Sequence, residues 1–285
     1  MTTDDPVQFP PPTMRAWTHS QAGIPSVALH LSSDAKTPAL TSSMDVLVRI
    51  THASLSPAGS IMMQFCPFLF RSKPAIPELD FAGTLIAVGA DVPKDRNLAP
   101  GDAVFGSVTV QPHLSAGAGA LAEYVVVASS SVVRKPEGIA LQGAAGLGVC
   151  GSTALMLYDR AGLKAGDSVL INGASGGIGT MVTQLARHAV GPSGRIVALC
   201  SGKNAKMVRS LGADEVRDLG LLEPISSSMW RWPRGRPSTG SHKSFVPRNS
   251  IWSDNFAANR SSTTKRRHRF ISTSPPNTPA AASMS

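Results

Sequence analysis

A glycine-rich turn between an apolar strand and a helix constrains this chain more than any other segment. Residues 168–171 form a β-branched apolar run, and the glycine-rich segment 172–179 follows directly. The next ten residues have the composition of a helix. Glycines let the backbone approach a pyrophosphate, and a helix start directs its unpaired N–H groups at the anion. The segment therefore predicts a dinucleotide site, with these turn residues as its members: Gly173, Ala174, Ser175, Gly176, Gly177, Ile178 and Gly179.

The end of the next strand indicates which dinucleotide binds. This apolar strand covers residues 194–200, and an Asp or Glu at its end would hold the ribose 2′-hydroxyl of NAD. Residues 200–204 contain no carboxylate, but they offer the Ser201 hydroxyl and the Lys203 ammonium, which suit a 2′-phosphate. We therefore expect NADPH as the cofactor. The alternative is that Lys203 merely lies in a solvated loop.

The order of short runs along the chain predicts a β-rich domain followed by an α/β domain. Strands are expected at 46–51, 81–89, 103–106 and 121–127, because these runs are apolar or β-branched and turn residues bound them. One or two buried helices are expected within 141–158, a further helix at 204–211 and a third parallel strand at 213–216. The predicted organisation is a flexible N-terminus at 1–13, a β-rich domain at 14–135, a partial Rossmann domain at 136–221 and a disordered tail at 222–285.

The net charge of +9 comes almost entirely from the tail. Residues 222–285 carry ten Lys and Arg against Glu223 and Asp254, while the rest of the chain is nearly neutral. Ser, Pro, Arg, Thr and Asn dominate this segment and no periodic apolar pattern remains, so its composition cannot offset the entropy of ordering. The charge is therefore a property of the predicted disordered tail and not of the folded body.

Targeting signals and cysteines suggest a cytoplasmic protein. No run of about 18 apolar residues is present, so no transmembrane helix is expected. The first six residues are acidic and proline-rich, unlike a signal peptide or a mitochondrial presequence, although Met14 offers an internal start. Cys66, Cys150 and Cys200 are widely spaced and form no CxxC pair, which favours a reducing compartment.

Residues 14–220 resemble the medium-chain dehydrogenase/reductase superfamily, in its zinc-independent quinone-reductase and enoyl-reductase branch. Four segments carry the resemblance in the family's order, at 77–89, 101–106, 122–125 and 166–218. Any one of them would be weak, but the ordered set is specific. The resemblance implies a GroES-like substrate domain and a Rossmann domain, with the active site in the cleft between them.

The same comparison argues against zinc. Leu79 stands where the zinc-dependent branch has its His ligand, and Ser56 falls near that branch's Cys position. The lobe of four cysteines that holds the structural zinc is absent. The histidines of the β-rich part lack metal-ligand spacing and are expected to be ordinary surface or turn residues; they are His19, His30, His52 and His113. We therefore expect no metal.

The resemblance implies hydride transfer from NADPH to a quinone or an α,β-unsaturated carbonyl compound. Relatives often supply a hydrogen bond to the developing enolate from an Asn-Pro-x-Asp segment. This chain has Ser56 in place of the Asn, while Gly59 lacks the carboxylate. Ser56 is the catalytic candidate, with a simple turn before Pro57 as the alternative. Thr153 is implied as a contact to the nicotinamide carboxamide at a helix start around 151–153, with plain helix capping as its alternative.

Nothing after residue 220 resembles the rest of such an enzyme, so we expect the chain to be C-terminally incomplete. A shifted reading frame or a retained intron near residue 220 would give an unpatterned, basic sequence of this kind. Alternatively the tail is genuine and its basic run 265–269 binds nucleic acid or an import receptor, which we do not favour. A homodimer is expected only with a complete C-terminal half. The competing function is an inactive truncated dinucleotide-binding protein, or a basic-tailed interaction protein.

Overall fold

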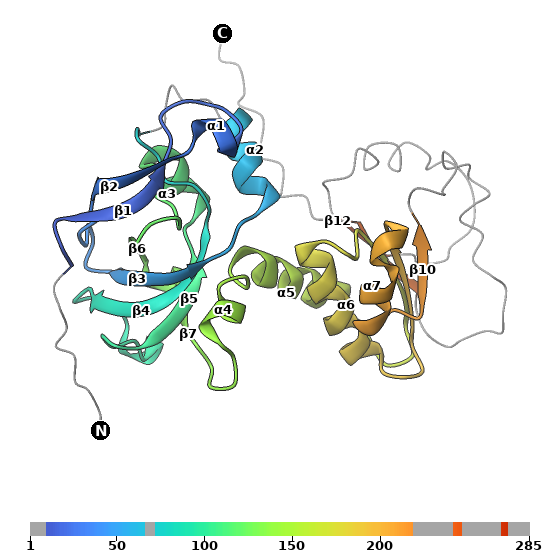
Figure 1. Ribbon diagram of the computed structural model, residues 1–285. Coiled ribbons are helices and arrows are strands. Elements are labelled where there is room, and N and C mark those ends of the chain that lie inside the picture. Colours follow the sequence, from blue (N-terminus) through green and yellow to red (C-terminus); the bar gives the residue numbers. More distant parts are fainter. Residues whose placement is uncertain (1–9, 66–71, 219–241, 247–268, 273–285) are drawn as a thin grey trace, which may run out of the picture. The chain divides into compact units, whose positions relative to one another are not determined.

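The computed structural model describes residues 10–65, 72–218, 242–246 and 269–272. The chain divides into two compact units, Met1–Val149 and Cys150–Ser285 (Figure 1). Each unit has a sheet of its own, and the first unit has a small second sheet as well. The fold is the GroES-like and Rossmann-like combination that the sequence predicted.

Antiparallel strands form the framework of the first unit. Its main sheet has the order β6-β3-β4-β5-β7, and a two-stranded sheet pairs β1 with β2. The strands are β1 (Thr13–Thr18), β2 (His30–Lys36), β3 (Asp45–Ala53), β4 (Asp80–Val88), β5 (Ala103–Ser107), β6 (Tyr124–Ala128) and β7 (Val132–Arg134). The four strands predicted from the sequence are confirmed as β3, β4, β5 and β6.

Short helices connect these strands. They are α1 (Pro25–Ala28), α2 (Pro57–Phe65), α3 (Val110–Ser115), α4 (Leu141–Ala144) and the 3₁₀ turns η2 (Lys94–Arg96) and η3 (Ser129–Ser131). The core includes Val46, Phe81 and Val104, which are fully buried. Consecutive residues are buried at 46–48 of β3 and at 80–83 of β4, so these β-branched and apolar runs form central strands with both faces covered over part of their length.

Helix α4 belongs to the first unit, although the sequence had predicted the nucleotide-binding domain to begin at residue 136. Ala144 and Ala145 pack against Ala82 of β4, with Leu141 and Phe105 beside them. This apolar contact holds the segment on the GroES-like sheet. The structure therefore divides the chain after Val149, later than the predicted boundary.

The second unit has a parallel sheet of five strands in the order β10-β9-β8-β11-β12. Its elements are α5 (Val149–Ala161), β8 (Ser168–Asn172), α6 (Gly177–Val190), β9 (Arg195–Cys200), η4 (Gly202–Asn204), α7 (Ala205–Ser210), β10 (Glu215–Asp218), β11 (His242–Val246) and β12 (Arg269–Ser272). In order of appearance this is 3-2-1-4-5, the beginning of the dinucleotide-binding order. The sheet reverses its direction of growth between β8 and β11.

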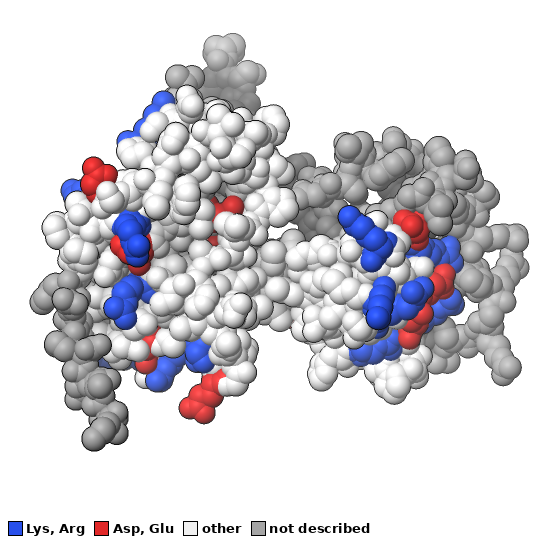
Figure 2. Space-filling model, in the orientation of Figure 1, with Lys and Arg blue, Asp and Glu red and all other residues white. Residues whose placement is uncertain are grey.

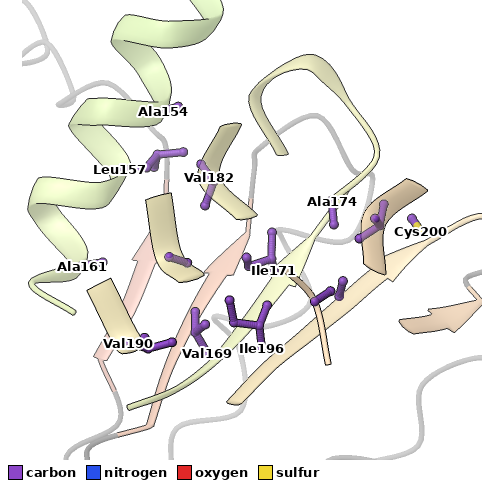
Figure 3. Packing of buried hydrophobic residues seen from close by; sticks show 14 residues of the cluster. Ala154, Leu157, Ala161, Val169, Ile171, Ala174, Val182, Val190, Ile196 and Cys200 are labelled. Atoms are coloured by element: carbon purple, nitrogen blue, oxygen red, sulfur yellow. The ribbon is translucent and has the colours of Figure 1, made fainter. Parts of the chain in front are cut away.

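One apolar cluster joins the helices to one face of this sheet. Figure 3 shows Leu157 of α5 and Val182 of α6 directed toward Ile171 and Ile196 of the central strands. All four side chains are at most 3% exposed. Burying an aliphatic side chain of this size stabilises the fold by about 1.5–3 kcal/mol. This packing fixes the end of β8 and the start of α6, between which the glycine-rich turn runs.

Two details of this unit correct the sequence analysis. The third strand begins at Glu215, two residues later than predicted, because Gly212 (φ +113°) turns the chain and Asp214 accepts the Ile196 N–H through its side chain at 2.7 Å. Residues 242–246 and 269–272 form β11 and β12, where disorder was predicted. Their backbones continue the ladder from the free edge of β8, a requirement that composition does not reveal. The remainder of the predicted tail lies outside the described residues.

Charged side chains of both signs lie together over the α7 and β10 part of the second unit (Figure 2). Arg187 pairs with Asp214, while Glu215 accepts from Arg195 at 2.5 Å and from Arg217 at 2.8 Å. Exposed pairs of this kind each contribute only about 0–1 kcal/mol. Within the described ranges, none of the helices combines the length and the apolar character that crossing a membrane requires.

Candidate functional site

The glycine-rich turn has the backbone geometry that a pyrophosphate needs. Gly173 directly follows β8 with φ +69°, a conformation that a side chain disfavours. Gly179 is buried in the first turn of α6, where a Cβ atom would lie 2.8 Å from the Ala174 Cα and closer still to the Gly173 carbonyl oxygen. These two glycines therefore permit the tight turn and the close helix-to-strand approach of a dinucleotide-binding fold.

The residues between them leave the helix start open. Gly176 and Gly177 are exposed, and Gly176 is the N-cap of α6 with no side-chain hydrogen bond. Helix geometry gives the amides of Gly177, Ile178 and Gly179 no acceptor inside the helix. An anion in front of this turn would accept from these N–H groups and lie at the positive end of the helix dipole. The predicted turn residues thus lie together, and they fit a dinucleotide pyrophosphate.

Ser175 joins this turn to the loop after β9. Its hydroxyl accepts a hydrogen bond from the Asn204 side-chain amide at 3.1 Å and also contacts the Cys200 thiol. Ser201 and Lys203 lie in that same loop and both are exposed. The structure therefore brings the predicted pyrophosphate turn and the predicted 2′-phosphate residues to one edge of the sheet.

A carboxylate that the sequence analysis missed also reaches this edge. Asp218 is the last residue of β10 and pairs in register with Cys200 at the end of β9. Its carboxyl carbon lies 3.1 Å from the position that a Cβ on Gly202 would take. Burial, followed by the Asp218 charge, raises the pKa of the Cys200 thiol. The expectation that no carboxylate lies near the end of β9 is therefore wrong. Parallel strands that end together bring their last residues side by side, so β10 places Asp218 next to the end of β9.

Thr153 lies in the second turn of α5 and is half-buried. The helix starts at Val149, earlier than the predicted start around 151–153, so Thr153 does not cap it. Cys150 of the same helix packs against Gly177, whose Cβ would lie 3.1 Å from the Cys150 sulfur. Residues three apart share a helix face, so Thr153 lies on the side of α5 that faces the start of α6.

In the first unit, Ser56 caps helix α2. The Ser56 hydroxyl accepts the Gly59 N–H at 3.2 Å, so Ser56 makes a helix-capping contact, where the alternative considered from the sequence was a simple turn before Pro57. The backbone N–H and the hydroxyl of Ser56 both donate to one oxygen of Glu78, each at 3.1 Å. Burial raises the pKa of the Glu78 carboxyl; the two hydrogen bonds from Ser56 oppose this shift, and the nearby Asp80 charge adds to it. The catalytic candidate is thus half of a Ser–Glu pair.

Asp80 is a second buried carboxyl next to this pair. Its two oxygens accept the Val149 N–H at 2.9 and 3.0 Å, and it is 7% exposed. Burial raises its pKa to about 6, although the hydrogen bond from Val149 opposes the shift. The sequence analysis named only Leu79, which lies between Glu78 and Asp80, and missed both carboxyls. Asp80 is the first residue of β4 and Glu78 precedes the strand, so the apolar run of β4 gives no sign that both carboxyls would be buried.

The histidines correct one further expectation. His19 and His113 are each 1% exposed, whereas all four histidines were expected at the surface or in turns. The His113 ring shares a hydrogen bond with the Ala118 carbonyl oxygen at 2.6 Å, and the His19 ring lies 3.3 Å from the Gln21 carbonyl oxygen. Across the described part of the chain, no three His, Cys, Asp or Glu side chains are placed to hold a metal ion.

Comparison with known proteins agrees with this architecture. Residues 42–137 match the alcohol dehydrogenase GroES-like domain family. The trans-enoyl reductase poxH of Penicillium oxalicum is 30% identical over 256 residues, which are 79% of this chain and 66% of poxH. The quinone oxidoreductase of Coxiella burnetii superposes with a TM-score of 0.66 at 26% identity, over 82% of this chain and 75% of that one.

The chain belongs to the medium-chain dehydrogenase/reductase superfamily. A further superfamily relative, the NADPH-dependent alkenal/one oxidoreductase of Arabidopsis thaliana chloroplasts, is 34% identical over 209 residues. That match covers 72% of this chain and 52% of the plant enzyme. The chain therefore spans about half to two thirds of the length of these curated superfamily relatives.

Proposed function

We propose that this protein is an NADPH-dependent, zinc-free oxidoreductase that transfers a hydride to a quinone or to an α,β-unsaturated carbonyl compound. The observation that carries the proposal is the open glycine turn at the start of α6, within a Rossmann-type strand order. Relatives named as enoyl reductase, quinone oxidoreductase and NADPH-dependent alkenal/one oxidoreductase support the reaction class.

Each predicted cofactor residue then has a distinct task. The amides at the start of α6 bind the pyrophosphate, while Lys203 and Ser201 bind the ribose 2′-phosphate. Lys203 suits this task because it is exposed and has no acidic partner among the described residues. Thr153 hydrogen-bonds the nicotinamide carboxamide. The bound cofactor supplies the hydride, and every other requirement falls on the chain itself.

The chain must also stabilise the negative charge that appears on the substrate oxygen after hydride addition. A hydroxyl that donates a hydrogen bond to this oxygen lowers the barrier, because the charge exists only after the transfer begins. Ser56 has such a hydroxyl and is only half-buried, so a substrate can reach it. No Lewis-acidic metal is needed for this hydrogen bond.

A fluorescence titration of the full chain with NADPH and with NADH tests the proposal first. We expect saturable binding of both, with NADPH tighter by about tenfold, which corresponds to about 1.4 kcal/mol. The variant Lys203→Ala should lose this preference and leave NADH binding unchanged. Lys164→Ala, on a different loop of the same unit, serves as the matched control.

Turnover is then measured as NADPH oxidation with a panel of enones and quinones. Oxidation that survives treatment with a zinc chelator supports the zinc-free reductase. A folded chain that binds no dinucleotide overturns the cofactor assignment. A chain that binds NADPH and reduces no member of the panel is instead the inactive dinucleotide-binding protein.

A further inference from the structure

Glu78 has an unusual backbone for a buried charged residue. Its φ of +64° lies in the left-handed region, which costs a residue with a Cβ atom free energy, and its side chain is only 7% exposed. Glu is not among the residues that tolerate this conformation readily. Strained backbones of this kind persist where the surroundings hold them in place, and they gather at functional sites. The contacts of its carboxyl group identify what holds Glu78 there.

Those contacts reproduce a capping box with its acid supplied from a distant segment. In a capping box the N-cap hydroxyl accepts the N3 N–H, while a Glu or Gln at N3 reaches back to the N-cap N–H. Ser56 is the N-cap of α2 and Gly59 is its N3 residue, which has no side chain to reach back. Glu78 accepts the Ser56 N–H instead.

The carboxyl group of Glu78 also fills the space that a residue 59 side chain would take. A Cβ on Gly59 would lie 2.5 Å from the Glu78 Cδ and 2.6 Å from its Oε2. A carboxylate at position 59 and one at position 78 therefore exclude each other. Gly59 and Glu78 thus form an exchange pair: the N3 position of α2 carries no acid, and the segment before β4 supplies one in its space.

The exchange places an acid behind a reachable hydroxyl. Ser56 is half-buried, whereas Glu78 is buried, so Ser56 is the member of the pair with surface open to a substrate. The Ser56 hydroxyl donates to Glu78 when the carboxyl is ionised, and the bond reverses when the carboxyl is protonated. The raised pKa of Glu78, caused chiefly by burial, allows it to keep a proton to higher pH than an exposed Glu.

We propose that Glu78 is the proton reservoir of Ser56 and sets the orientation of its hydroxyl during reduction. This inference rests on the proposed reductase function. As the hydride adds to the substrate carbon, the oxygen that becomes negative takes the hydroxyl hydrogen of Ser56. Ser56 Oγ takes the proton of Glu78 Oε2, which leaves Glu78 ionised. Water then returns a proton to Glu78, so the substrate has gained one hydride and one proton in total.

The variant Glu78→Gln separates this role from helix capping. Its amide oxygen still accepts the Ser56 N–H, so α2 remains capped, but the amide has no proton to release. We expect kcat to fall by about 10²-fold, the lower range for general acid catalysis, while KM and the melting temperature change little. The pH profile of kcat should also lose the ionisation step that the wild type owes to the Glu78 carboxyl. Glu137→Gln, at an exposed loop position, is the matched control.

The reverse exchange is a rescue test. Glu78→Gly removes the carboxyl and should lower kcat like Glu78→Gln, whereas Gly59→Asp alone forces two acids into one space and should lower the melting temperature. The double variant Gly59→Asp/Glu78→Gly returns the acid to the N3 position of α2. We expect it to recover most of the kcat lost by Glu78→Gly. A double variant no better than its parents overturns the exchange.

Infrared spectroscopy gives a readout that needs neither substrate nor cofactor. In the wild type minus Glu78→Gln difference spectrum, the carbonyl stretch of a protonated carboxylic acid should titrate above the pKa of an exposed Glu. Both proteins carry Asp80→Asn for this measurement, because the Asp80 and Glu78 charges interact and Asp80 would otherwise titrate differently in the two. A Glu78 band that titrates like an exposed Glu overturns the proton reservoir.

The outcomes for the two proposals are distinct. Turnover by the wild type that Glu78→Gln leaves unchanged overturns the role of Glu78, while the reductase function stands. A wild type that binds NADPH without turnover overturns the reductase and the catalytic step with it. The infrared difference and the melting temperatures then decide whether the Ser56–Glu78 pair holds a proton and caps the helix.

Discussion

The candidate site of the second unit consists mainly of backbone groups, whereas that of the first unit consists of side-chain groups. In the second unit, backbone amides, a left-handed glycine and a helix start form the glycine-rich turn, proposed to bind the dinucleotide, within one continuous segment. In the first unit, a hydroxyl and two buried carboxyls meet from segments more than twenty residues apart. A site built from glycine backbone is disrupted by any added side chain. A site built from carboxyl side chains changes with the protonation of those carboxyls. The two units should therefore respond to different perturbations.

The largest effect is expected from bulk in the dinucleotide turn. Gly179→Ala places a methyl group against the Gly173 carbonyl oxygen and the Ala174 backbone. Because backbone atoms cannot move aside cheaply, we expect a loss of about 3 kcal/mol in the free energy of unfolding of the second unit. Denaturant unfolding measures this loss. Gly176→Ala, whose Cβ would approach no atom closer than 3.4 Å, is the control in the same unit, and equal stability of the two variants would contradict the packing argument.

The first unit should instead show a pH-dependent stability that Asp80 controls. The folded pKa of Asp80 is about 6, above its ordinary value of 3.8, so folding favours the protonated form. The stabilising contribution is therefore full only below the unfolded pKa of 3.8 and is lost as the pH rises through 6, a fall of about 2.4 kcal/mol between pH 4 and 7. Asp80→Asn should flatten this region of the unfolding curve. A wild type whose stability is constant from pH 4 to 7 would contradict the assignment.

A third prediction separates cofactor binding from folding inside the second unit. Gly176 is exposed with φ −79°, so a larger residue fits the fold there but occupies the space in front of the helix start. Gly176→Val should weaken NADPH binding at least about tenfold, or 1.4 kcal/mol. The unfolding free energy should fall by no more than about 1 kcal/mol, the cost of a poorer N-cap residue. Unchanged affinity in the titration would place the pyrophosphate elsewhere.

The smallest effect concerns the carboxylate near the 2′-phosphate residues. Asp218 lies beside Gly202, one residue from Lys203, and it repels a phosphate bound there. Asp218→Asn should tighten NADPH binding by a factor of about three, or roughly 0.6 kcal/mol, and leave NADH binding unchanged. The gain should shrink as salt is added. A tightening of NADH instead would mean that Asp218 does not face the 2′-phosphate.

The comparison also explains what could be predicted from the sequence. The turn at Gly173–Gly179 was predictable because its glycines, the strand before it and the helix after it are contiguous. Strand β4 was predictable from its apolar run, but the burial of Glu78 and Asp80 was not. The acid opposite Gly59 comes from a different segment, and only the fold brings them together.

Two further features escaped prediction for the same physical reason. Asp218 meets Gly202 because β10 and β9 pair in parallel, a relation between distant residues. The strand His242–Val246 pairs with β8 although its surroundings have the composition of a disordered segment. Pairing with an existing strand edge decides the structure of such a segment, and local composition does not record that edge.

The hydrogen bond between Asn204 and Ser175 has a consequence for the cost of binding. It fastens the loop after β9 to the turn after β8 before any ligand arrives. A dinucleotide with phosphates at both places would then meet a surface already arranged, and would lose its own freedom without also having to freeze two independent loops. Ordering each mobile side chain on binding costs about 0.5–1.5 kcal/mol. A single amide that holds two loops in advance thus leaves more of the contact energy available as affinity.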